Sequence, residues 1–449
     1  MAARRTIAVI GSGISGLGAA WLLSQRHDVT LFEAASRPGG HSNTVDAPAN
    51  RRTVPVDTGF IVYNTACYPN LIAMFEHLGV DTAPTDMSFS VSLDGGGYEY
   101  AGSSLATLFG QPTNLVRSGH WRMLADTLRF FREAPGLSGA AADESMTLGA
   151  YLTAQSYSDA FVSRHILPMA AAIWSTPSAR VLDFPLASFV RFFANHGLLQ
   201  VRNRPQWRTV AGGSRTYVDR ILDAARIETR LGEAARAVLR SEAHATVRTA
   251  HAEHRFDAVV IATHADDALA LLGGDADHDE RRLLGAFPYA CNRAVLHSDA
   301  SLMPKRRRLW SSWNYIGGGD GPEARLCVSY WMNKLQPLGP DAPQLFVTLN
   351  PPHEPAPGTN IAAFDYAHPI FDRGAMAAQR QLWQLQGRRR TWFCGSYFGY
   401  GFHEDGLQAG LAAAEDIGGV RRPWNVPDES GRIHLRQASQ APRFLEPAA

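Results

Sequence analysis

The chain opens with a short apolar run, followed by closely spaced glycines and then by a longer apolar stretch. Residues 7–10 are aliphatic, which is typical of a strand buried in a parallel sheet. Residues 17–23 have the character of a buried helix. Between them stand Gly11, Gly13 and Gly16, in the spacing GxGxxG. The pattern therefore predicts a strand, a tight turn and a helix near the N-terminus.

Each of these glycines has its own expected role in a strand–turn–helix unit that binds a dinucleotide. Gly11 allows the tight turn, Gly13 lets the backbone approach a pyrophosphate, and Gly16 lets the helix pack closely on the sheet. Residues 29–32 predict a second strand that ends in Glu33, whose carboxylate can bind both hydroxyls of an unphosphorylated adenosine ribose. We expect a dinucleotide here; the alternative is a turn of the same shape without a ligand.

The stretch from residue 68 to residue 145 alternates helical and strand-like patterns. We expect a helix over residues 68–76 and, over residues 88–100, a β-hairpin that turns at Asp94-Gly95-Gly96-Gly97. Residues 121–133 predict an amphipathic helix, because apolar side chains recur at helical spacing. These side chains are Trp121, Leu124, Leu128 and Phe131. A loop is expected over residues 137–145.

Large apolar and aromatic side chains dominate residues 151–193, which have helical character and contain no glycine-rich phosphate loop. This block fits a substrate domain that is inserted into the nucleotide-binding domain. Its aromatic side chains are interpreted as core, with the wall of an apolar tunnel as the alternative. The same two interpretations, core packing or the lining of a cavity, apply to Trp310, Trp313 and Trp331.

Beyond residue 206 the pattern returns to that of a nucleotide-binding domain. The expected elements are a loop (208–214), a helix (217–225), short strands (227–230 and 235–239) and a second buried strand (256–263). Strand-like pieces at 292–297, 326–331 and 344–349 are assigned to the sheet of the substrate domain. Residues 391–394 predict a strand, which a glycine-rich loop connects to a helix over residues 407–416.

Composition narrows the class of protein. At 449 residues the chain exceeds one usual domain, so we expect two, which can be interleaved. Hydrophobic residues at 45% and charged residues at 19% are values of a folded globular protein. The formal net charge of +1 argues against binding of nucleic acid by the whole protein. Basic runs at 305–308 and 388–390 are interpreted as solvated surface, or as contacts for an anionic surface such as lipid headgroups.

The cysteines and the N-terminus bear on the compartment. Four scattered cysteines without a CxxC pair fit a reducing compartment, with neither a disulfide framework nor a zinc site. Arg4-Arg5 before an apolar run resembles an export signal, but its removal would destroy the glycine turn. No other stretch approaches the roughly eighteen apolar residues of a membrane span. We expect a cytoplasmic protein, with peripheral contact to the inner face of the membrane as a further expectation.

Two further motifs extend the first one: RPGGH at residues 37–41 and DTGF at residues 57–60. With GxGxxG and Glu33, they resemble the amine-oxidase and phytoene-desaturase superfamily of FAD proteins. The resemblance implies FAD and an α/β fold, in which a Rossmann-type, glutathione-reductase-like domain is interleaved with an amine-oxidase-like α+β substrate domain of mixed sheet and helices. It implies an FAD-binding domain of residues 1–80, 207–275 and 385–425, a substrate domain of residues 81–206 and 276–384, and a tail of residues 426–449.

The resemblance also implies which residues contact the cofactor. The segment after Glu33 contacts the ribityl and phosphate region, Ala235 the adenine side, and Ala262-Thr263 the pyrophosphate. The N-terminus of the last helix points at the N1–C2 edge of the flavin, where a positive helix end stabilises the charge of the reduced state. The implied cofactor-binding residues are Gly11, Ser12, Gly13, Ile14, Ser15, Gly16, Glu33, Ala34, Arg37, Gly39, Gly40, His41, Thr58, Gly59, Phe60, Ala235, Ala262, Thr263, Gly395, Ser396, Glu404, Gly406 and Leu407.

The stretches PGGHSNT, DTGFIVYN, IATHADDAL and GSYFGYGFHEDGL are more closely similar to a bacterial subgroup of the superfamily. Its members are commonly associated with cyclopropane-synthase-like methyltransferases and include the flavin desaturase of furan fatty acid formation. The resemblance implies a lipid acyl substrate, namely a methylated monounsaturated chain of a phospholipid that is oxidised to a methyl-branched diene. It also implies a functional partnership with such a methyltransferase.

Loss of a hydride requires a base for the second hydrogen, and the candidates are His403, Tyr397, Tyr400 and His196. Either histidine can instead be structural. A fatty-acid double-bond isomerase, which takes and returns a hydride, stays open as an alternative.

An amine oxidase is the second alternative; in this superfamily such enzymes favour an aromatic cage and a lysine-held water near flavin N5, neither of which we assign. A protein that holds FAD without catalysis is a third. No metal is expected, because His251 and His254 lack further ligands at suitable spacing and fit a polar surface strand.

Overall fold

The computed structural model describes residues 4–50, 52–137, 146–174, 181–201, 204–317 and 327–435. The chain forms two compact units, each assembled from separate segments. The first unit consists of Met1–Gly40, Ile221–Phe287 and Gly374–Ala449. The second consists of His41–Arg220 and Pro288–Arg373. These units are defined by packing alone, so the functional domain boundaries given above stay a prediction.

A parallel sheet forms the centre of the first unit. In the described part of the chain its strands have the order β10-β2-β1-β14-β20, and every neighbouring pair is parallel. The bounds are β1 Thr6–Ile10, β2 Asp28–Glu33, β10 Ile227–Leu231, β14 Ala258–Ile261 and β20 Thr391–Phe393. This order confirms a Rossmann-type α/β fold for the nucleotide-binding part, because β1 lies between β2 and β14 in the middle of the sheet.

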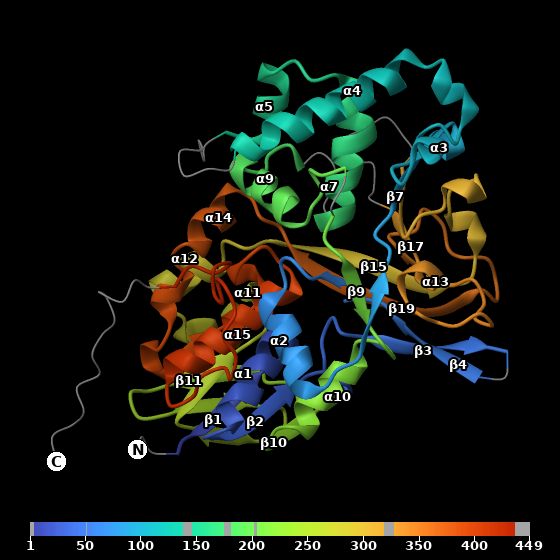
Figure 1. Cartoon of the computed structure of the whole chain (residues 1–449). Coiled ribbons are helices and arrows are strands. Elements are labelled where there is room, and N and C mark those ends of the chain that lie inside the picture. Colours follow the sequence, from blue (N-terminus) through green and yellow to red (C-terminus); the bar gives the residue numbers. More distant parts are fainter. Residues whose placement is uncertain are drawn as a thin grey trace. The chain divides into compact units, whose positions relative to one another are not determined.

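Helices α1 (Ile14–Ser24) and α15 (His403–Ile417) pack against each other in this unit, and Figure 1 shows them side by side. The other elements of the unit are the antiparallel strands β11 Ala237–Arg240, β12 Ala245–Arg248 and β13 Glu253–Phe256, and the helices α11 Ala265–Leu272, α12 His278–Leu284 and α14 Arg373–Gln379. The expected helix over 407–416 is confirmed, and it begins at His403 because Phe402 and Asp405 cap it.

A mixed sheet forms the centre of the second unit. Within the described residues its strands have the order β19-β15-β18-β17-β16-β7-β8. They are β7 Phe89–Leu93, β8 Tyr98–Ala101, β15 Tyr289–His297, β16 Trp313–Ile316, β17 Val328–Trp331, β18 Phe346–Leu349 and β19 Asn360–Pro369. The antiparallel pairing of β7 with β8 confirms the predicted hairpin. The three strand-like pieces assigned to this sheet are confirmed as parts of β15, β17 and β18.

Smaller sheets and several helices complete the second unit. The strands are β3 Thr44–Ala49 with β4 Arg52–Asp57, and β5 Tyr63–Asn64 and β6 Thr82–Thr85 on either side of β9 Trp207–Val210. The helices are α2 Pro69–Leu78, α3 Leu105–Leu108, α4 Ser118–Glu133, α5 Leu148–Ala154, α6 Asp159–Phe161, α7 Leu167–Trp174, α9 Leu186–Asn195 and α10 Arg215–Asp223, the last of which contains the unit boundary. Most of the loop expected over 137–145 lies outside the described residues.

Two expectations about local structure were wrong. Residues 208–210 are not loop, because they belong to β9, which pairs with both β5 and β6. Helix α4 is confirmed, but it buries His120, Met123 and Phe130, whereas Trp121 and Leu128 are 51% and 56% exposed. A periodic pattern shows that one face of a helix is apolar; it does not show what covers that face.

The basic runs are not simple solvated surface. Arg306 forms an ion pair at 2.7 Å with Glu99, which is fully buried. Arg388 pairs with Asp279 at 3.0 Å, and Arg389 pairs with Asp275 at 2.6 Å. These arginines therefore hold segments of their own unit together.

The four cysteines, all among the described residues, are free, as the scattered spacing predicted. Cys394 is fully buried, which fits its interpretation as a packing residue. No helix within the described residues combines the length and hydropathy that a membrane span requires. Trp310 packs edge-on against Trp331 at 5.5 Å between ring centroids, which favours core packing over a cavity wall.

Candidate functional site

The turn after β1 has the geometry that the glycine spacing predicts. Gly11 has a φ of +100°, and a Cβ there would lie 2.8 Å from the carbonyl oxygen of Ala262. A Cβ on Gly16 would lie 1.9 Å from the carbonyl oxygen of Gly11. Only glycine fits at either position, so these two residues bring α1 and the end of β14 close to the turn.

Gly13 differs from these two glycines. Its φ of −64° suits any residue, and no atom lies within 4 Å of the position that its Cβ would take. The space in front of Gly13 is open, and Gly13 is the N-cap of α1. The backbone N–H groups of the first helical turn have no partner within the helix and carry the positive end of its dipole. This arrangement fits a diphosphate group.

Glu33, at the end of β2, is tied to the same turn. Its Oε2 accepts hydrogen bonds from the Ser12 N–H (2.9 Å) and Ser12 Oγ (2.5 Å). Its Oε1 accepts one from the Ala35 N–H (2.8 Å). An ionised carboxylate offers about four acceptor positions, so Glu33 retains capacity for a ribose hydroxyl. Ser12 has a role in the architecture of the turn, and its contact with a cofactor stays a prediction.

Two loops lie beside this end of the sheet. The Gly39 N–H donates to the Ser12 carbonyl at 3.0 Å, and a Cβ on Gly40, whose φ is +56°, would lie 3.1 Å from the Gly13 Cα. Arg37 donates to the Gly40 carbonyl at 2.9 Å and so stabilises this loop. The loop that contains Ala235 is fixed by the Glu233 N–H, which donates to the Glu33 carbonyl at 3.0 Å. Ala34 follows Glu33 directly.

Thr263 and Gly395 continue the site along the carboxyl ends of β14 and β20. A Cβ on Gly395 would lie 3.4 Å from the Thr263 carbonyl oxygen and 2.4 Å from the Tyr397 ring. In an open parallel sheet, ligands bind at the carboxyl ends of the strands. The structure therefore brings together the sequence-predicted residues of the first unit along one edge of the sheet.

Helix α15 begins next to the N-terminus of α1. A Cβ on Gly406 would lie 2.7 Å from Ser15 Oγ and 3.0 Å from Ile14 Cγ2. The Leu407 side chain packs on Gly18, so only the backbone of Leu407 is available to a ligand. Ser396 lies beside Gly406, 3.6 Å from its Cβ position. Two helix N-termini thus lie side by side.

The acidic side chains of the first turn of α15 are fully buried. Glu404 accepts a hydrogen bond from Gln408 at 2.9 Å. Asp405 accepts one from the Phe402 N–H at 2.8 Å and one from Arg432 at 3.3 Å. Burial raises the pKa of Asp405, against the effect of Arg432 and of the backbone donors. Neither carboxylate is placed to meet a substrate directly.

The loop before α15 carries three of the four candidate bases. Tyr397 is almost fully buried, its carbonyl accepts a hydrogen bond from Gln379 at 2.9 Å, and its ring packs on Phe287 at 5.3 Å. Tyr400 and His403 are half-buried. Burial lowers the pKa of His403 to about 3, so its imidazole is neutral at physiological pH. Catalysis by any of these residues stays a prediction.

The remaining cofactor candidates lie in the second unit. The Phe60 N–H donates to the His41 carbonyl at 2.8 Å, and a Cβ on Gly59 would lie 2.2 Å from that oxygen. Thr58 Oγ1 lies 2.7 Å from the Tyr366 hydroxyl, and the His41 ring packs on Tyr366 at 4.9 Å between centroids. Residues 41 and 58–60 therefore form one compact cluster.

His196, the fourth candidate base, is also in the second unit and is 4% exposed. Its ring stacks on Phe192 at 3.9 Å between centroids, and Nδ1 lies 2.9 Å from the Phe192 carbonyl oxygen. Since a carbonyl only accepts, Nδ1 carries the proton. These contacts fit a histidine that packs at the end of α9.

The sequence patterns did not single out Tyr366 or Arg432. Tyr366 hydrogen-bonds to Asn43 as well as to Thr58, and Arg432 reaches the buried Asp405 from the predicted tail. The alternation of Phe364, Tyr366 and His368 along β19 was a usable signal, because side chains two apart share a face.

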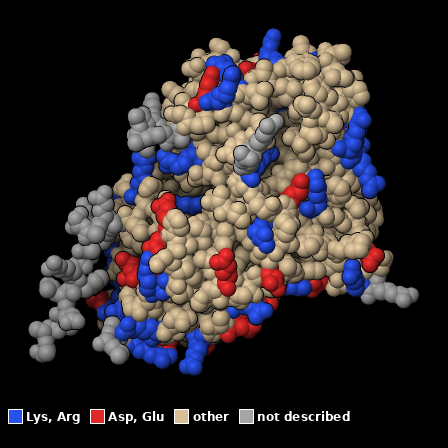
Figure 2. Space-filling model, in the orientation of Figure 1, with Lys and Arg blue, Asp and Glu red and all other residues tan. Residues whose placement is uncertain are grey.

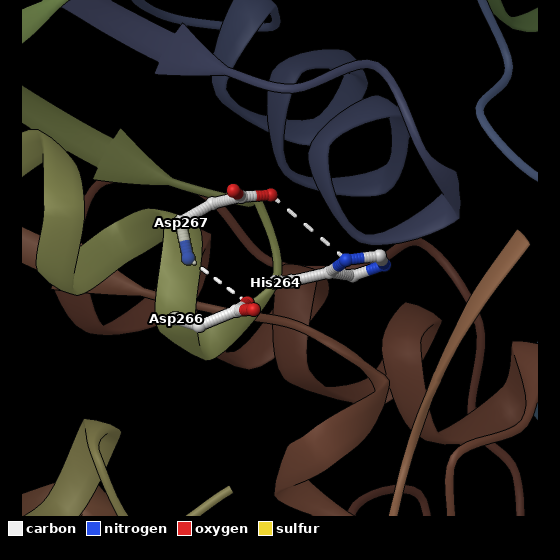
Figure 3. Close-up of side chains that lie close together, drawn as sticks. All are labelled: His264, Asp266 and Asp267. Atoms are coloured by element: carbon white, nitrogen blue, oxygen red, sulfur yellow. Dashed lines mark hydrogen bonds and ion pairs between the residues drawn. The ribbon is translucent and has the colours of Figure 1, made fainter. Parts of the chain in front are cut away.

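One group of possible metal ligands occurs among the described residues, at the N-terminus of α11 (Figure 3). His264 Nδ1 lies 3.9 Å from Asp267 Oδ2, and the Asp267 N–H donates to Asp266 at 2.9 Å. Both aspartates are exposed. These contacts are typical of a helix start, and we assign no metal to the group. His254, one histidine of the HxxH pair, lies on β13, and its Nε2 is 3.4 Å from the Glu233 carboxylate.

The parallel sheet, its glycine turn and the acidic end of β2 define a dinucleotide-binding protein. A family comparison matches residues 14–282 to the flavin containing amine oxidoreductases. Since the match covers more than half of the chain, the protein belongs to this family. It is an FAD-dependent oxidoreductase, and the open space at Gly13 and the helix N-terminus beside it fit that cofactor.

Solved structures with the same fold act on different substrates. A fatty acid isomerase from P. acnes that produces CLA is 14% identical, with a TM-score of 0.63, over 92% of this chain and 97% of that one. Cyclohexylamine oxidase from Brevibacterium oxydans IH-35A is 16% identical, with a TM-score of 0.65, over 92% of this chain and 100% of that one. Putrescine oxidase bound to putrescine is 15% identical, with a TM-score of 0.65, over 92% of this chain and 99% of that one. At these identities the likeness shows the fold alone. A comparison with curated protein sequences gave no match.

Proposed function

We propose that the protein is a desaturase that removes a hydride and a proton from an unsaturated fatty acyl chain of a phospholipid, preferably one that carries a methyl branch. The resemblance of the sequence to the desaturase subgroup motivates this substrate. In the resulting reaction the acyl chain loses two hydrogens and gains one double bond. A cyclopropane-synthase-like methyltransferase would supply the methylated chain.

One observation supports an uncharged substrate. The half-buried side chains that precede and begin α15 are Tyr400, Phe402 and His403, and His403 is neutral. The carboxylates of Glu404 and Asp405 are fully buried and hydrogen-bonded within the unit. The segment that the family resemblance assigns to the flavin edge therefore offers an alkyl chain apolar contacts and offers an ammonium group no exposed carboxylate.

The lysine content supports the same choice. The chain contains two lysines, and the resemblance implies a lysine-held water in amine oxidases. Lys305 is exposed. Lys334 donates to Ser88 at 2.9 Å and pairs with Asp86 at 3.3 Å, so its ammonium group is already engaged.

The residues of the chain have defined tasks in this proposal. When bound, FAD supplies a two-electron acceptor for the hydride of a C–H bond. The N–H groups of α1 hold the diphosphate, and those of α15 stabilise negative charge. His403 and Tyr400 are the candidates that accept the proton, because Tyr397 and His196 are buried within packed side chains.

The fatty acid isomerase of the same fold favours a double-bond isomerase as second candidate, with the hydride returned to the chain. The test is an anaerobic titration of the yellow holoprotein with a methyl-branched unsaturated phospholipid, an unbranched one and an amine. We expect the flavin absorbance to bleach with the branched lipid. Bleaching by amines alone would overturn the proposal and indicate an amine oxidase. A lipid product of unchanged mass would favour the isomerase.

A further inference from the structure

Large apolar side chains are exposed together in one segment of the second unit. Ten such side chains are exposed among the described residues, and half of them lie between residues 105 and 128. They are Leu105 (76%), Leu115 (54%), Val116 (86%), Trp121 (51%) and Leu128 (56%), which we call the apolar patch. Single exposed apolar residues are ordinary, whereas a cluster indicates a binding surface.

Trp121 connects α4 to the segment that precedes it. Trp121 Nε1 donates to the Leu115 carbonyl at 2.9 Å, which brings the α4 side chain onto the preceding loop. The Trp121 ring also packs on Phe109, the residue after α3, at 4.9 Å between centroids. Trp121 and Leu128 are seven residues apart and so lie on one face of α4. This face is opposite the one that buries Met123 and Phe130.

The charge around the patch is positive. Residues 102–128, which span the patch, contain Arg117, Arg122 and one acidic residue, Asp126, whose carboxylate accepts hydrogen bonds from Ser158. Arg117 also lines a recess of about 610 Å³ together with Arg164, Ser118 and Asp94. Figure 2 shows the face over α3 and α4 as largely uncharged, with scattered basic side chains and a few acidic ones. His120, a buried residue of α4, stays neutral because burial, Arg164 and Arg117 lower its pKa to about 4.

We propose that the apolar patch docks the protein on the surface of a membrane that contains anionic phospholipids. An exposed helix face with a tryptophan, leucines and flanking arginines is the arrangement that inserts at the headgroup boundary. A second copy of the chain is a poorer partner, because a symmetric contact would bring together two surfaces of the same net positive charge. The proposed docking does not use the basic runs at 305–308 and 388–390, since several of their arginines form ion pairs within their own units.

The proposal is independent of the reaction, and vesicle co-sedimentation of the full-length holoprotein tests it. We expect binding to vesicles of phosphatidylcholine with phosphatidylglycerol, weaker binding to phosphatidylcholine alone, and weaker binding at high salt. The variant V116S/L128S is expected to bind roughly tenfold or more weakly, because each lost side chain removes apolar burial. Both residues are exposed, so the variant keeps its flavin spectrum.

The matched control is V201S, which removes a 65% exposed side chain outside the patch and should bind like the wild type. Equal binding of V116S/L128S and wild type would overturn the proposal, as would a folded wild type that ignores anionic vesicles. A dimer that V116S/L128S converts into a monomer, without vesicle binding, would assign the patch to a second copy instead. R122Q is expected to weaken binding to anionic vesicles while leaving binding to phosphatidylcholine unchanged.

Discussion

Gly13 is the residue at which the requirements of the fold and those of the cofactor can be separated. Gly11 and Gly16 are glycines because their neighbours leave no room for a Cβ, whereas the space at Gly13 is open. The variant G13A is therefore expected to fold normally, with a loss of at most about 1 kcal/mol at this N-cap. Its methyl group would occupy the space of the diphosphate and weaken FAD binding roughly a hundredfold, or by about 2.7 kcal/mol.

The affinity is measured by titrating apoprotein with FAD, and the stability by urea unfolding of the apoprotein. G102A is the control, since Gly102 also has open space around its Cβ position but lies in the second unit. FAD affinity of G13A equal to that of the wild type would contradict the assignment of the open space to the cofactor.

Asp57 of the DTGF motif is a second residue with a measurable role. Its fully buried carboxylate accepts hydrogen bonds from Thr44, Ser214 and Gln336. Burial nevertheless raises its pKa to about 6, above the usual value near 3.8. Because the folded state favours the protonated form, this stabilisation is complete below pH 3.8 and is lost as the pH rises through 6.

The predicted consequence is a pH-dependent difference between wild type and D57N. The excess stability of the wild type over D57N should fall by about 2.5 kcal/mol between pH 4 and pH 7, since one pKa unit corresponds to about 1.4 kcal/mol and the unfolded carboxyl is already partly ionised at pH 4. Urea unfolding across this range measures it. D365N, which removes an exposed carboxylate from the same unit, is the control. A difference that rises with pH would show that the hydrogen bonds outweigh the burial.

At the scale of elements, the packing of α1 on α15 places both helix N-termini at the site. A Cβ on Gly410 would lie 2.1 Å from the Ser15 carbonyl oxygen, a backbone atom that cannot move aside. A Cβ on Gly18 would lie 2.7 Å from the end of the Leu407 side chain and in ordinary contact with Leu411, so no backbone atom would obstruct it. We therefore expect G410A to cost about 2 kcal/mol or more of unfolding free energy, and G18A to cost clearly less. Thermal unfolding of both variants measures the order, and equal effects would contradict it.

The elements nearest the N-terminus could be predicted from the sequence because they depend on local rules. The glycine spacing, the aliphatic strand and Glu33 each restrict the backbone within a few residues. The sequence therefore predicted β1, α1 and β2. Helix α4 was predicted as an element, but not its orientation, because periodicity does not identify the packing partner. Strand β9 was missed because its pairing with β5 and β6 depends on residues more than one hundred positions away.

At the scale of the whole chain, the sequence predicted the fold class, the family and FAD. It predicted the residues along the sheet edge, because the glycines and Glu33 carry their geometry in their spacing. The alternation along β19 could have marked Tyr366 as a residue of one strand face, but its contact with Thr58 could not be predicted. The same holds for the contact of Arg432 with Asp405, because both contacts join segments that only the folded chain brings together. The reaction depends on which substrate binds. Substrate binding depends on contacts between distant segments, which no local sequence pattern encodes.

The mass of the lipid product tests the central claim most directly. The holoprotein is mixed without oxygen with a methyl-branched monounsaturated phospholipid, and the lipid is analysed by mass spectrometry after a single turnover. The account predicts a product that is lighter by two hydrogens, in an amount equal to the flavin that was reduced. A lipid of unchanged mass beside reduced or oxidised flavin would contradict the desaturase.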